Sequence, residues 1–306
     1  MKYLVLGAGG TGGCIAAYLA EGGMDVTMIA RGAHLEAMRA NGFLVKGTRM
    51  GDLCLREDKL KLATTEDYEE KADVILLCVK SYSVEELVPF MRKATHEKSL
   101  IIPILNVVNT GEVLAKWLPE RTVLSGCIYI ASYISAPGVV EQLTPSFRVV
   151  YGDREGTADK EMMEAVAQDM RSCNMDIVVA ENIAQAAFDK FLFLSPYAAA
   201  GAYLDVLSSE FQKEGEARDL FVALLKEVVG ISKALGYDYG KDMVAAKTDH
   251  LKVLNPTSTA SMVKDVKKGG KSEIDGLVFE VVRMGRKLGV PCPNYEKVAA
   301  HFGYTL

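Results

Sequence analysis

The stretch KYLVLGAGGTGG at residues 2–13 decides the fold of this chain. An apolar, strand-like run ends in a GxGxxG pattern, and a helical run rich in small residues follows. In such a pattern the first glycine permits a tight turn, the second lets the backbone approach a pyrophosphate, and the third allows close helix–sheet packing. This context predicts a dinucleotide-binding loop rather than a merely flexible glycine turn. The expected contacts of the cofactor are Gly7, Gly9, Gly10, Thr11 and Gly12.

The residue after the second predicted strand bears on which dinucleotide is bound. NAD enzymes usually carry Asp or Glu there, about 20 residues after the loop, to bind the ribose 2′-hydroxyl. Here the strand VTMIA at residues 26–30 is followed by Arg31. A guanidinium suits a 2′-phosphate through charge-assisted hydrogen bonds, so the sequence predicts NADPH as the cofactor. The alternative is that Arg31 is an ordinary solvated residue. The missing acid also argues against an S-adenosylmethionine methyltransferase.

Polar residues follow two further predicted strands. Lys80 follows ADVILLCV at residues 72–79, and Asn106 follows SLIIPIL at residues 99–105. Ligands of open α/β sheets bind outside the carboxyl ends of the strands. Both residues are therefore candidate ligand contacts, and the alternative for each is a turn residue.

The first 180 residues have the pattern of a doubly wound α/β domain. Short, near-continuously apolar strands alternate with helical runs, which indicates a parallel sheet covered on both faces. Longer strand-like runs between residues 122 and 152 predict an antiparallel extension at the sheet edge, and a helix at 159–173 and a strand at 176–180 follow. We expect an NADPH-binding Rossmann domain at 1–180 and an all-helical substrate-binding and catalytic domain at 181–306. The helices expected in the second domain are 183–203, 211–235, 241–254, 258–267, 273–288 and 295–302.

Composition limits the classes of function. The chain of 306 residues is 49% apolar and 25% charged, with a formal net charge of −5 and no long run of Lys or Arg. These values give little reason to expect a nucleic acid or an anionic membrane as partner. No apolar stretch approaches the roughly 18 residues that a membrane span needs, and the N-terminus lacks the layout of a signal peptide. We expect a cytoplasmic protein.

Metal and disulfide chemistry are not expected. The six cysteines are scattered without a CxxC pair, and the four histidines show no HExxH spacing. Several cysteines lie in apolar runs, so we interpret them as reduced, buried small hydrophobic residues.

One lysine interrupts an apolar helical segment, FDKFLFLSPYAAAGAYL at residues 188–204. Helical spacing places Lys190 on one face with apolar and aromatic side chains. Desolvation there lowers the pKa of an ammonium unless a carboxylate offsets it, which would make a tunable proton donor. The alternative is a lysine at a helix edge whose ammonium reaches solvent.

Glu273 lies at another predicted helix start. Ser272 is interpreted as the N-cap and Asp275 as the partner in a capping-box-like arrangement, which places Glu273 in the first turn. The positive end of the helix favours an ionised carboxylate that binds a cation or a substrate hydroxyl. The alternative is a surface Glu that only complements the helix dipole.

Together these motifs resemble those of the ketopantoate reductase (2-dehydropantoate 2-reductase) family over essentially the whole chain. The last of them is the most specific, because the spacing from Ser261 through Asp265 to Glu273 matches the family pattern of Ser, Asp and a Glu-Ile-Asp triplet. The segments that carry the resemblance are GAGGTGG (7–13), IARG (29–32), VILLCVKSY (74–82), ILNVVNTGE (104–112), FDKFLF (188–193) and SMVKDVKKGGKSEIDGL (261–277).

The resemblance implies roles for single residues. Lys190 is similar to the family's catalytic lysine and Glu273 to its essential glutamate. Arg31 and Lys80 match contacts to the adenosine phosphate. Asn106 matches an asparagine near the nicotinamide and the substrate, and Ser261 matches a ligand of the substrate carboxylate.

The chain also departs from the family pattern. Four and eight residues after the catalytic lysine the family commonly carries Asn, and this chain has Leu194 and Ala198. The usual Asn-Gly at the strand end is Asn106-Val107 here. A more apolar substrate pocket is therefore expected.

These observations predict an NADP-dependent oxidoreductase acting on CH–OH groups. We expect NADPH to reduce a small branched 2-oxo acid to the 2-hydroxy acid in a cleft between the domains, with Lys190 as general acid. Ketopantoate, the substrate that the resemblance implies in pantothenate biosynthesis, is the leading candidate. The alternatives are a reductase for another 2-oxo acid, another dehydrogenase of this two-domain plan, or a non-catalytic NADPH sensor. Apolar helices in the second domain leave a homodimer open.

Overall fold

The computed structural model describes residues 1–305, which form two compact units. The first unit holds Met1–Leu105 and Asn109–Ala187, and the second holds Asn106–Val108 together with the chain from Phe188 onward. The boundary thus falls after residue 187 rather than at the expected residue 180. The start of the long helix α6 (Ile183–Leu204) belongs to the first unit because Ile183 and Ala187 pack with Cys127 and Val150.

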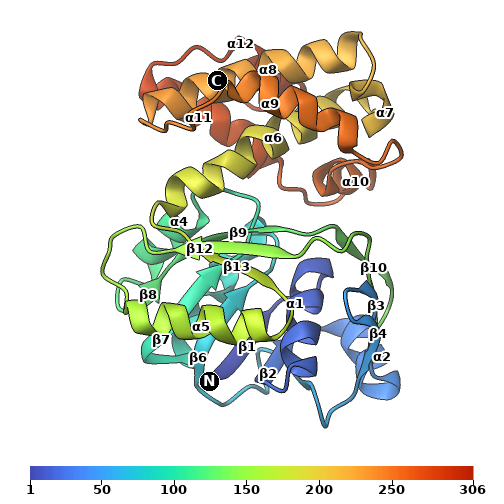
Figure 1. Cartoon of the computed structure of the whole chain (residues 1–306), viewed down its shortest axis with the longest axis vertical. Coiled ribbons are helices and arrows are strands. Elements are labelled where there is room, and N and C mark those ends of the chain that lie inside the picture. Colours follow the sequence, from blue (N-terminus) through green and yellow to red (C-terminus); the bar gives the residue numbers. More distant parts are fainter. Residues whose placement is uncertain (306) are drawn as a thin grey trace. The chain divides into compact units, whose positions relative to one another are not determined.

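A parallel sheet of six strands is the centre of the first unit (Figure 1). Its strand order, which reverses beside the N-terminal strand, is that of a dinucleotide-binding fold. All neighbouring strands are parallel. In spatial order they are β5 (Lys61–Ala63), β2 (Asp25–Ile29), β1 (Lys2–Leu6), β6 (Ala72–Leu77), β7 (Thr95–Pro103) and β8 (Thr122–Val123).

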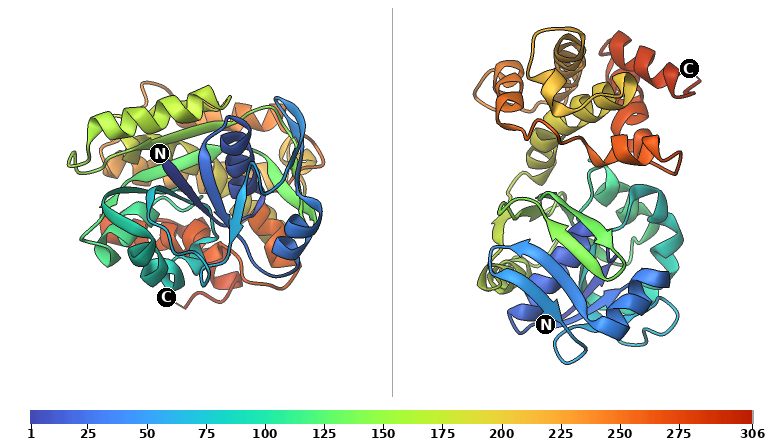
Figure 2. Two further views of the ribbon diagram at one scale, coloured as in Figure 1. Left: turned by 90° about the horizontal axis from the view of Figure 1, so that it is seen from below. Right: turned by 90° about the vertical axis from the view of Figure 1, so that its right-hand side faces the viewer.

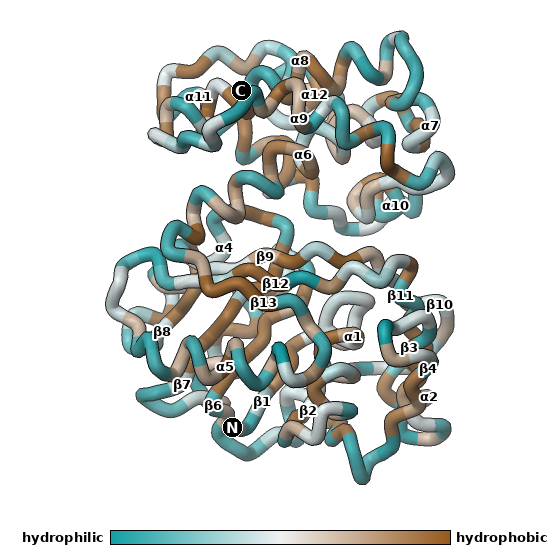
Figure 3. Tube along the Cα trace, viewed as in Figure 1, coloured by the Kyte–Doolittle hydropathy of each residue, from teal (hydrophilic) through white to brown (hydrophobic). Residues whose placement is uncertain are grey.

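Both faces of this sheet are covered, as the apolar strands predicted. In β1, Tyr3 and Val5 join the core cluster that contains α1 (Gly10–Glu21) and α5 (Lys160–Ser172). Leu4 and Leu6 face the opposite way, toward α3 (Val88–Ala94) and α4 (Thr110–Trp117). Figure 3 accordingly shows the central strands as hydrophobic along much of their length. The remaining helical segments of this unit are α2 (Gly32–Asn41), η1 (Ser81–Ser83) and η2 (Glu85–Leu87).

The antiparallel pairing predicted between residues 122 and 152 is present, but it does not extend the six-stranded sheet. The strand-like runs after residue 122 divide between two further sheets. One has the order β10 (Ser132–Ala136), β11 (Val139–Gln142), β3 (Phe43–Thr48) and β4 (Gly51–Leu55), and the right-hand view of Figure 2 shows these strands together. The other has the order β13 (Asp176–Val179), β12 (Arg148–Gly152) and β9 (Ser125–Tyr129). The strands β3 and β4 were not expected.

The second unit is helical, as predicted, with most helices shorter than expected. Its core is an apolar cluster that includes Phe191, Phe221, Leu277 and Tyr295. After α6 the helices are α7 (Ser208–Phe211), α8 (Glu216–Ala234), α9 (Met243–His250), η3 (Leu251–Val253), α10 (Ser261–Lys267), the π-helical turn η4 (Asp275–Phe279), α11 (Glu280–Leu288) and α12 (Pro293–His301). Within residues 1–305, no helix is both long and apolar enough to cross a membrane.

Candidate active site

The glycine loop of the first unit has the geometry that dinucleotide binding requires. Gly7 has φ +106°, a conformation that favours glycine. A side chain at Gly12 would overlap the carbonyl oxygen of Gly7 and lie 2.9 Å from Cβ of Cys78, so α1 packs closely on the sheet. By contrast, no described heavy atom lies within 4 Å of the position that a Cβ of Gly9 would take. The open side of the loop is thus at the second glycine, where the backbone can approach a pyrophosphate.

The N-terminus of α1 can receive an anion. The helix begins at Gly10, carries no acidic residue in its first turn, and Gly9 supplies no side chain as a cap. Backbone N–H groups at such an end point outward and favour negative charge. Thr11 stands in this first turn and is partly exposed. The residues at the loop therefore fit the phosphates of a dinucleotide.

Arg31 and Lys80 follow strands whose carboxyl ends lie beside the loop. β2 and β6 flank β1, with Ile29 and Leu77 paired in register with Leu6. Arg31 is exposed and precedes α2, and Lys80 is half-buried and precedes η1. The sheet therefore brings both cations to the edge that carries the glycine loop, as the strand-end rule predicts.

Two contacts, one at this loop and one at the neighbouring helix α2, were not foreseen from the sequence. The backbone of Ser132, at the start of β10, would lie only 2.6 Å from a side chain at Gly10. His34, in α2, accepts a hydrogen bond through Nδ1 from the backbone N–H of Gly138, at 2.9 Å. Burial lowers the pKa of His34, and the backbone carbonyl of Ala8 opposes that shift. The β10–β11 hairpin thus supports the loop from residues more than a hundred positions away.

Lys190, Asn106 and Glu273 form a hydrogen-bonded group in the second unit. Nζ of Lys190 donates to Oδ1 of Asn106 at 2.7 Å, and Nδ2 of Asn106 lies 3.5 Å from Oε2 of Glu273. Lys190 and Asn106 are half-buried, whereas Glu273 is only 2% exposed. Asn106 thus bridges an ammonium and a buried carboxylate. The surface role considered for Glu273 is wrong.

The helix predicted to start at Ser272 begins later. The backbone carbonyl of Glu273 accepts from the N–H of Leu277 at 3.0 Å, and the π-helical turn η4 follows. The expected capping box is therefore not formed, because Glu273 precedes the first helical turn instead of standing in it. π-Helical turns are rare and are frequent at functional sites.

A buried hydroxyl pair holds this turn against α6. Oγ of Ser195 donates to the backbone carbonyl of Leu277 at 2.6 Å and lies 2.6 Å from the hydroxyl of Tyr295. Burial raises the pKa of Tyr295, so its hydroxyl remains protonated. Ser195 is on the same helix as Lys190, and this contact fixes the helix that carries the lysine relative to the segment that carries Glu273.

The remaining residues singled out in the sequence are not members of the hydrogen-bonded group. Ser261, the first residue of α10, is exposed and donates no described hydrogen bond to Lys190, Asn106 or Glu273. Leu194 is partly exposed one turn after Lys190, and Ala198 is fully buried. Ala198 therefore packs in the core of the second unit.

Metal and disulfide sites are absent from the described residues, which contain no cluster of metal-ligating side chains and six free cysteines. Cys14, Cys127, Cys173 and Cys292 are buried, as expected for small hydrophobic residues. Cys54 is exposed, which corrects the expectation for that residue.

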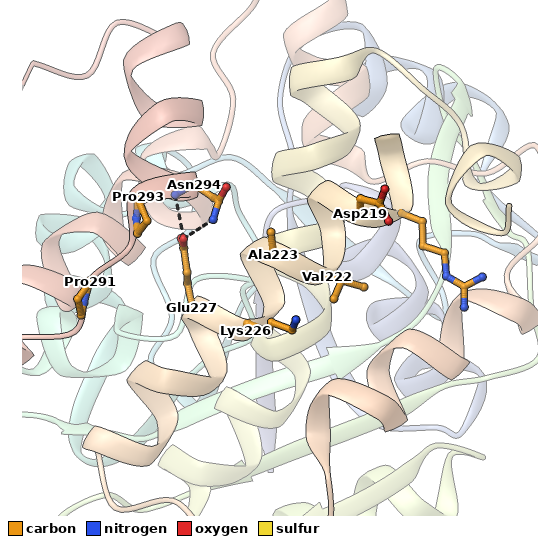
Figure 4. Close-up of a pocket in the computed structure, with 9 residues that line it drawn as sticks. Asp219, Val222, Ala223, Lys226, Glu227, Pro291, Pro293 and Asn294 are labelled. Atoms are coloured by element: carbon orange, nitrogen blue, oxygen red, sulfur yellow. Dashed lines mark hydrogen bonds between the residues drawn. The ribbon is translucent and has the colours of Figure 1, made fainter. Parts of the chain in front are cut away.

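An open depression of about 560 Å³ lies elsewhere in the second unit, between α8 and the start of α12 (Figure 4). Its most buried charged group is Glu227, whose carboxylate accepts from both nitrogens of Asn294 and from the backbone N–H of Tyr295. These bonds cap α12. The carboxylate therefore stabilises the packing of α12 against α8.

Comparison with known proteins identifies the family of the chain. The protein-family model described as "Ketopantoate reductase PanE/ApbA" matches residues 3–156, and the family model for the C-terminal domain matches residues 182–303. The chain is 25% identical to an "Uncharacterized oxidoreductase YkpB" of Bacillus subtilis, over 98% of this chain and 97% of that protein. It is 24% identical to a 2-dehydropantoate 2-reductase of Aquifex aeolicus, over 97% of this chain and 94% of that protein.

Solved structures share the fold over almost the whole chain. A 2-dehydropantoate 2-reductase from Porphyromonas gingivalis is 26% identical with a TM-score of 0.83, and 99% of each chain is covered. A D-mandelate dehydrogenase, solved with NADH and anilino(oxo)acetate, has a TM-score of 0.87 at 18% identity, with 98% and 96% covered. That second likeness concerns the fold alone. The two family models together span most of the sequence, and the chain therefore belongs to the ketopantoate reductase family.

Proposed function

We propose that this oxidoreductase uses NADPH to reduce a small branched 2-oxo acid to the corresponding 2-hydroxy acid. The observation that carries the proposal is the group Lys190–Asn106–Glu273, in which an ammonium is held at 2.7 Å by an amide that also faces a buried carboxylate. A positioned cation of this kind stabilises the negative charge that develops on a carbonyl oxygen during reduction.

The chemistry divides between cofactor and protein. NADPH, when bound at the glycine loop, supplies the hydride that adds to the C2 carbonyl carbon. As the carbonyl double bond opens, its electron pair moves to the oxygen, and Lys190 donates a hydrogen bond and then a proton to that oxygen. Asn106 accepts a hydrogen bond from Nζ of Lys190 and so orients the remaining N–H groups of the lysine. Glu273, which is only 2% exposed, faces the amide nitrogen of Asn106 and so fixes the orientation of that amide.

The preference for NADPH rests on Arg31 and Lys80. Both cations follow strands at the edge of the sheet that carries the loop, where the adenosine half of a dinucleotide would lie. An exposed guanidinium at the end of β2 offers fork-shaped donors to a 2′-phosphate, whereas NADH has only a hydroxyl there.

The substrate class is the least constrained part of the proposal. Relatives named 2-dehydropantoate 2-reductase make ketopantoate the first compound to test. The D-mandelate dehydrogenase of the same fold makes aryl 2-oxo acids the next. Purified protein would be incubated with NADPH and such a panel, and the loss of reduced-nicotinamide absorbance would be followed.

The decisive comparison uses the variant Lys190→Met. We expect turnover of the best substrate to fall about 100- to 10,000-fold, the range typical of removing a general acid, while NADPH binding measured by cofactor fluorescence is kept. Lys233→Met, at an exposed lysine near the end of α8, is the matched control. Retention of most turnover in Lys190→Met would refute the role of the lysine. NADPH binding without turnover of any 2-oxo acid would support the alternative, a non-catalytic sensor.

A further inference from the structure

Val107 occupies a space that only a glycine at position 276 leaves open. A side chain at Gly276 would overlap Cγ2 of Val107 and lie 2.9 Å from its Cγ1. Gly276 belongs to the π-helical turn η4, three residues after Glu273, and Val107 directly follows Asn106. The isopropyl group of Val107 is therefore held beside the residues that face the reacting carbonyl in the proposed function.

Val107 is not part of the apolar core cluster of the second unit. It is partly exposed, whereas its neighbour Val108 does contact that cluster. The pairing with Gly276 fixes where it stands, and part of its surface is exposed. A side chain that is held in place yet incompletely covered is suited to contact a substrate.

Leu194 presents a second apolar surface near the same group. It follows Lys190 by four residues on α6, so the two side chains share a helix face. Leu194 borders the core cluster but is partly exposed, unlike Leu192, which is fully buried. Lys190 is in turn bonded to Asn106, the neighbour of Val107. Two apolar side chains thus accompany the two polar groups that would hold the carbonyl.

We propose that Val107 and Leu194 form an apolar wall that selects 2-oxo acids with a purely hydrocarbon branch at C3 over those that carry a hydroxyl. The inference rests on the proposed function and names its substrate class. The hydrocarbon side chains of Val107 and Leu194 can neither donate nor accept a hydrogen bond, so the wall gives a substrate hydroxyl no partner. A hydroxyl against this wall loses its water partners without regaining them.

A matched pair of compounds tests the selection. Ketopantoate and 3,3-dimethyl-2-oxobutanoate differ only in the hydroxyl of ketopantoate. We expect kcat/KM with NADPH to be about 10- to 100-fold higher for the compound without the hydroxyl, the range over which an apolar pocket rejects an added hydroxyl.

Three variants locate the effect. Leu194→Asn and Val107→Thr each place a polar group in the wall, and Val107→Thr keeps the shape that Gly276 accommodates. Both are expected to lower the ratio of kcat/KM values at least about threefold, by offering the hydroxyl a hydrogen-bond partner. Leu207→Asn, at an exposed leucine of the same unit, is the matched control and keeps the ratio. Thermal unfolding confirms that each variant is folded.

The outcomes separate the two proposals. Equal or better use of ketopantoate by the unmodified protein would overturn the selection and leave the proposed reduction intact. An unchanged ratio in both wall variants would overturn the assignment of Val107 and Leu194. Binding of NADPH without turnover of either compound would overturn the proposed function and the inference with it.

Discussion

Nζ of Lys190 donates a hydrogen bond of 2.7 Å to Oδ1 of Asn106, a residue 84 positions earlier in the chain. The amide nitrogen of Asn106 lies 3.5 Å from Oε2 of Glu273. Asn106 therefore orients the lysine and also faces a carboxylate that is only 2% exposed. The ammonium is thus positioned by an acceptor from a distant segment of the chain.

Replacement of Asn106 tests this positioning. In Asn106→Ala the lysine loses a fixed acceptor, and we expect kcat to fall about 10- to 100-fold, as for a misplaced catalytic group. In Asn106→Asp a second carboxylate faces Glu273, so a larger loss and a shifted pH profile of kcat are expected. Asn41→Ala, at an exposed asparagine at the end of α2, is the control. A kcat within twofold of the unmodified enzyme in both Asn106 variants would contradict the role of Asn106 in positioning Lys190.

The glycine loop gives a prediction that separates folding from binding. Gly12→Ala places a methyl group into the carbonyl of Gly7, so we expect loss of stability of about 1–3 kcal/mol, typical of overpacking. Gly9→Ala meets no described atom within 4 Å, so the apo protein should keep its unfolding midpoint. If the pyrophosphate approaches at Gly9, the Kd for NADPH of that variant rises about tenfold or more. Denaturant unfolding and cofactor fluorescence measure the two effects. Unchanged NADPH affinity in Gly9→Ala would place the cofactor elsewhere.

Arg31 is expected to set the preference between the two nicotinamide cofactors. In Arg31→Ala, kcat/KM with NADPH should fall about 10- to 100-fold, because charge-assisted hydrogen bonds to the 2′-phosphate are lost. The value with NADH should change less than about threefold, since that ribose carries no phosphate. Arg39→Ala, at an exposed arginine of α2, the helix that follows Arg31, controls for general loss of positive charge. An equal fall with both cofactors would mean that Arg31 acts on the fold or on the common part of the dinucleotide.

Much of the fold was predictable because it is encoded locally. The alternation of apolar strands and helices predicts the doubly wound sheet, and the helix expected at 159–173 and the strand expected at 176–180 are found at Lys160–Ser172 and Asp176–Val179. The strands β3 and β4 were missed because β3 is completed by β11, almost a hundred residues later. Local pattern contains no information about such pairing.

The candidate site was predictable by residue type and only partly by contact. The apolar surroundings of Lys190 and the strand-end position of Asn106 mark both residues in the sequence. Their bond to each other, and the burial of Glu273, depend on packing between distant segments. The π-helical turn and the fit of Val107 over Gly276 have no local signal, because each is a property of two segments together.

His34 makes the stability of the first unit dependent on pH. Its Nδ1 accepts from Gly138, which requires the neutral ring, and burial lowers its pKa below the ordinary value of 6.5. The unfolded chain therefore takes up a proton before the folded chain as the pH falls. This contribution to stability is present above pH 6.5 and is lost as the pH falls through the lower pKa of the folded state.

The variant His34→Asn removes this titration while keeping an acceptor for Gly138. Its Tm should fall less steeply between pH 7 and pH 5 than that of the unmodified protein. His301→Asn, at an exposed histidine, should follow the unmodified curve. Parallel curves for His34→Asn and the unmodified protein would contradict the role of His34. Burial also lowers the pKa of His250, which contributes equally to all three proteins.

Glu227 provides the last prediction, because it caps a helix to which it does not belong. The carboxylate, on α8, is 9% exposed and accepts at 2.8 Å from the backbone N–H of Asn294, at 2.6 Å from its Nδ2 and at 3.0 Å from the backbone N–H of Tyr295. Glu227→Ala leaves these N–H groups at the start of α12 without their acceptor. We expect the free energy of unfolding to fall by about 2–4 kcal/mol, since bonds to charged groups are among the stronger ones. Urea denaturation measures the loss, and Glu214→Ala, at an exposed glutamate before α8, is the control. Tyr295 also contacts Ser195, which is on the same helix as Lys190, so the cap helps to hold that helix in place. A fall in the free energy of unfolding of less than about 0.5 kcal/mol would contradict both roles of Glu227.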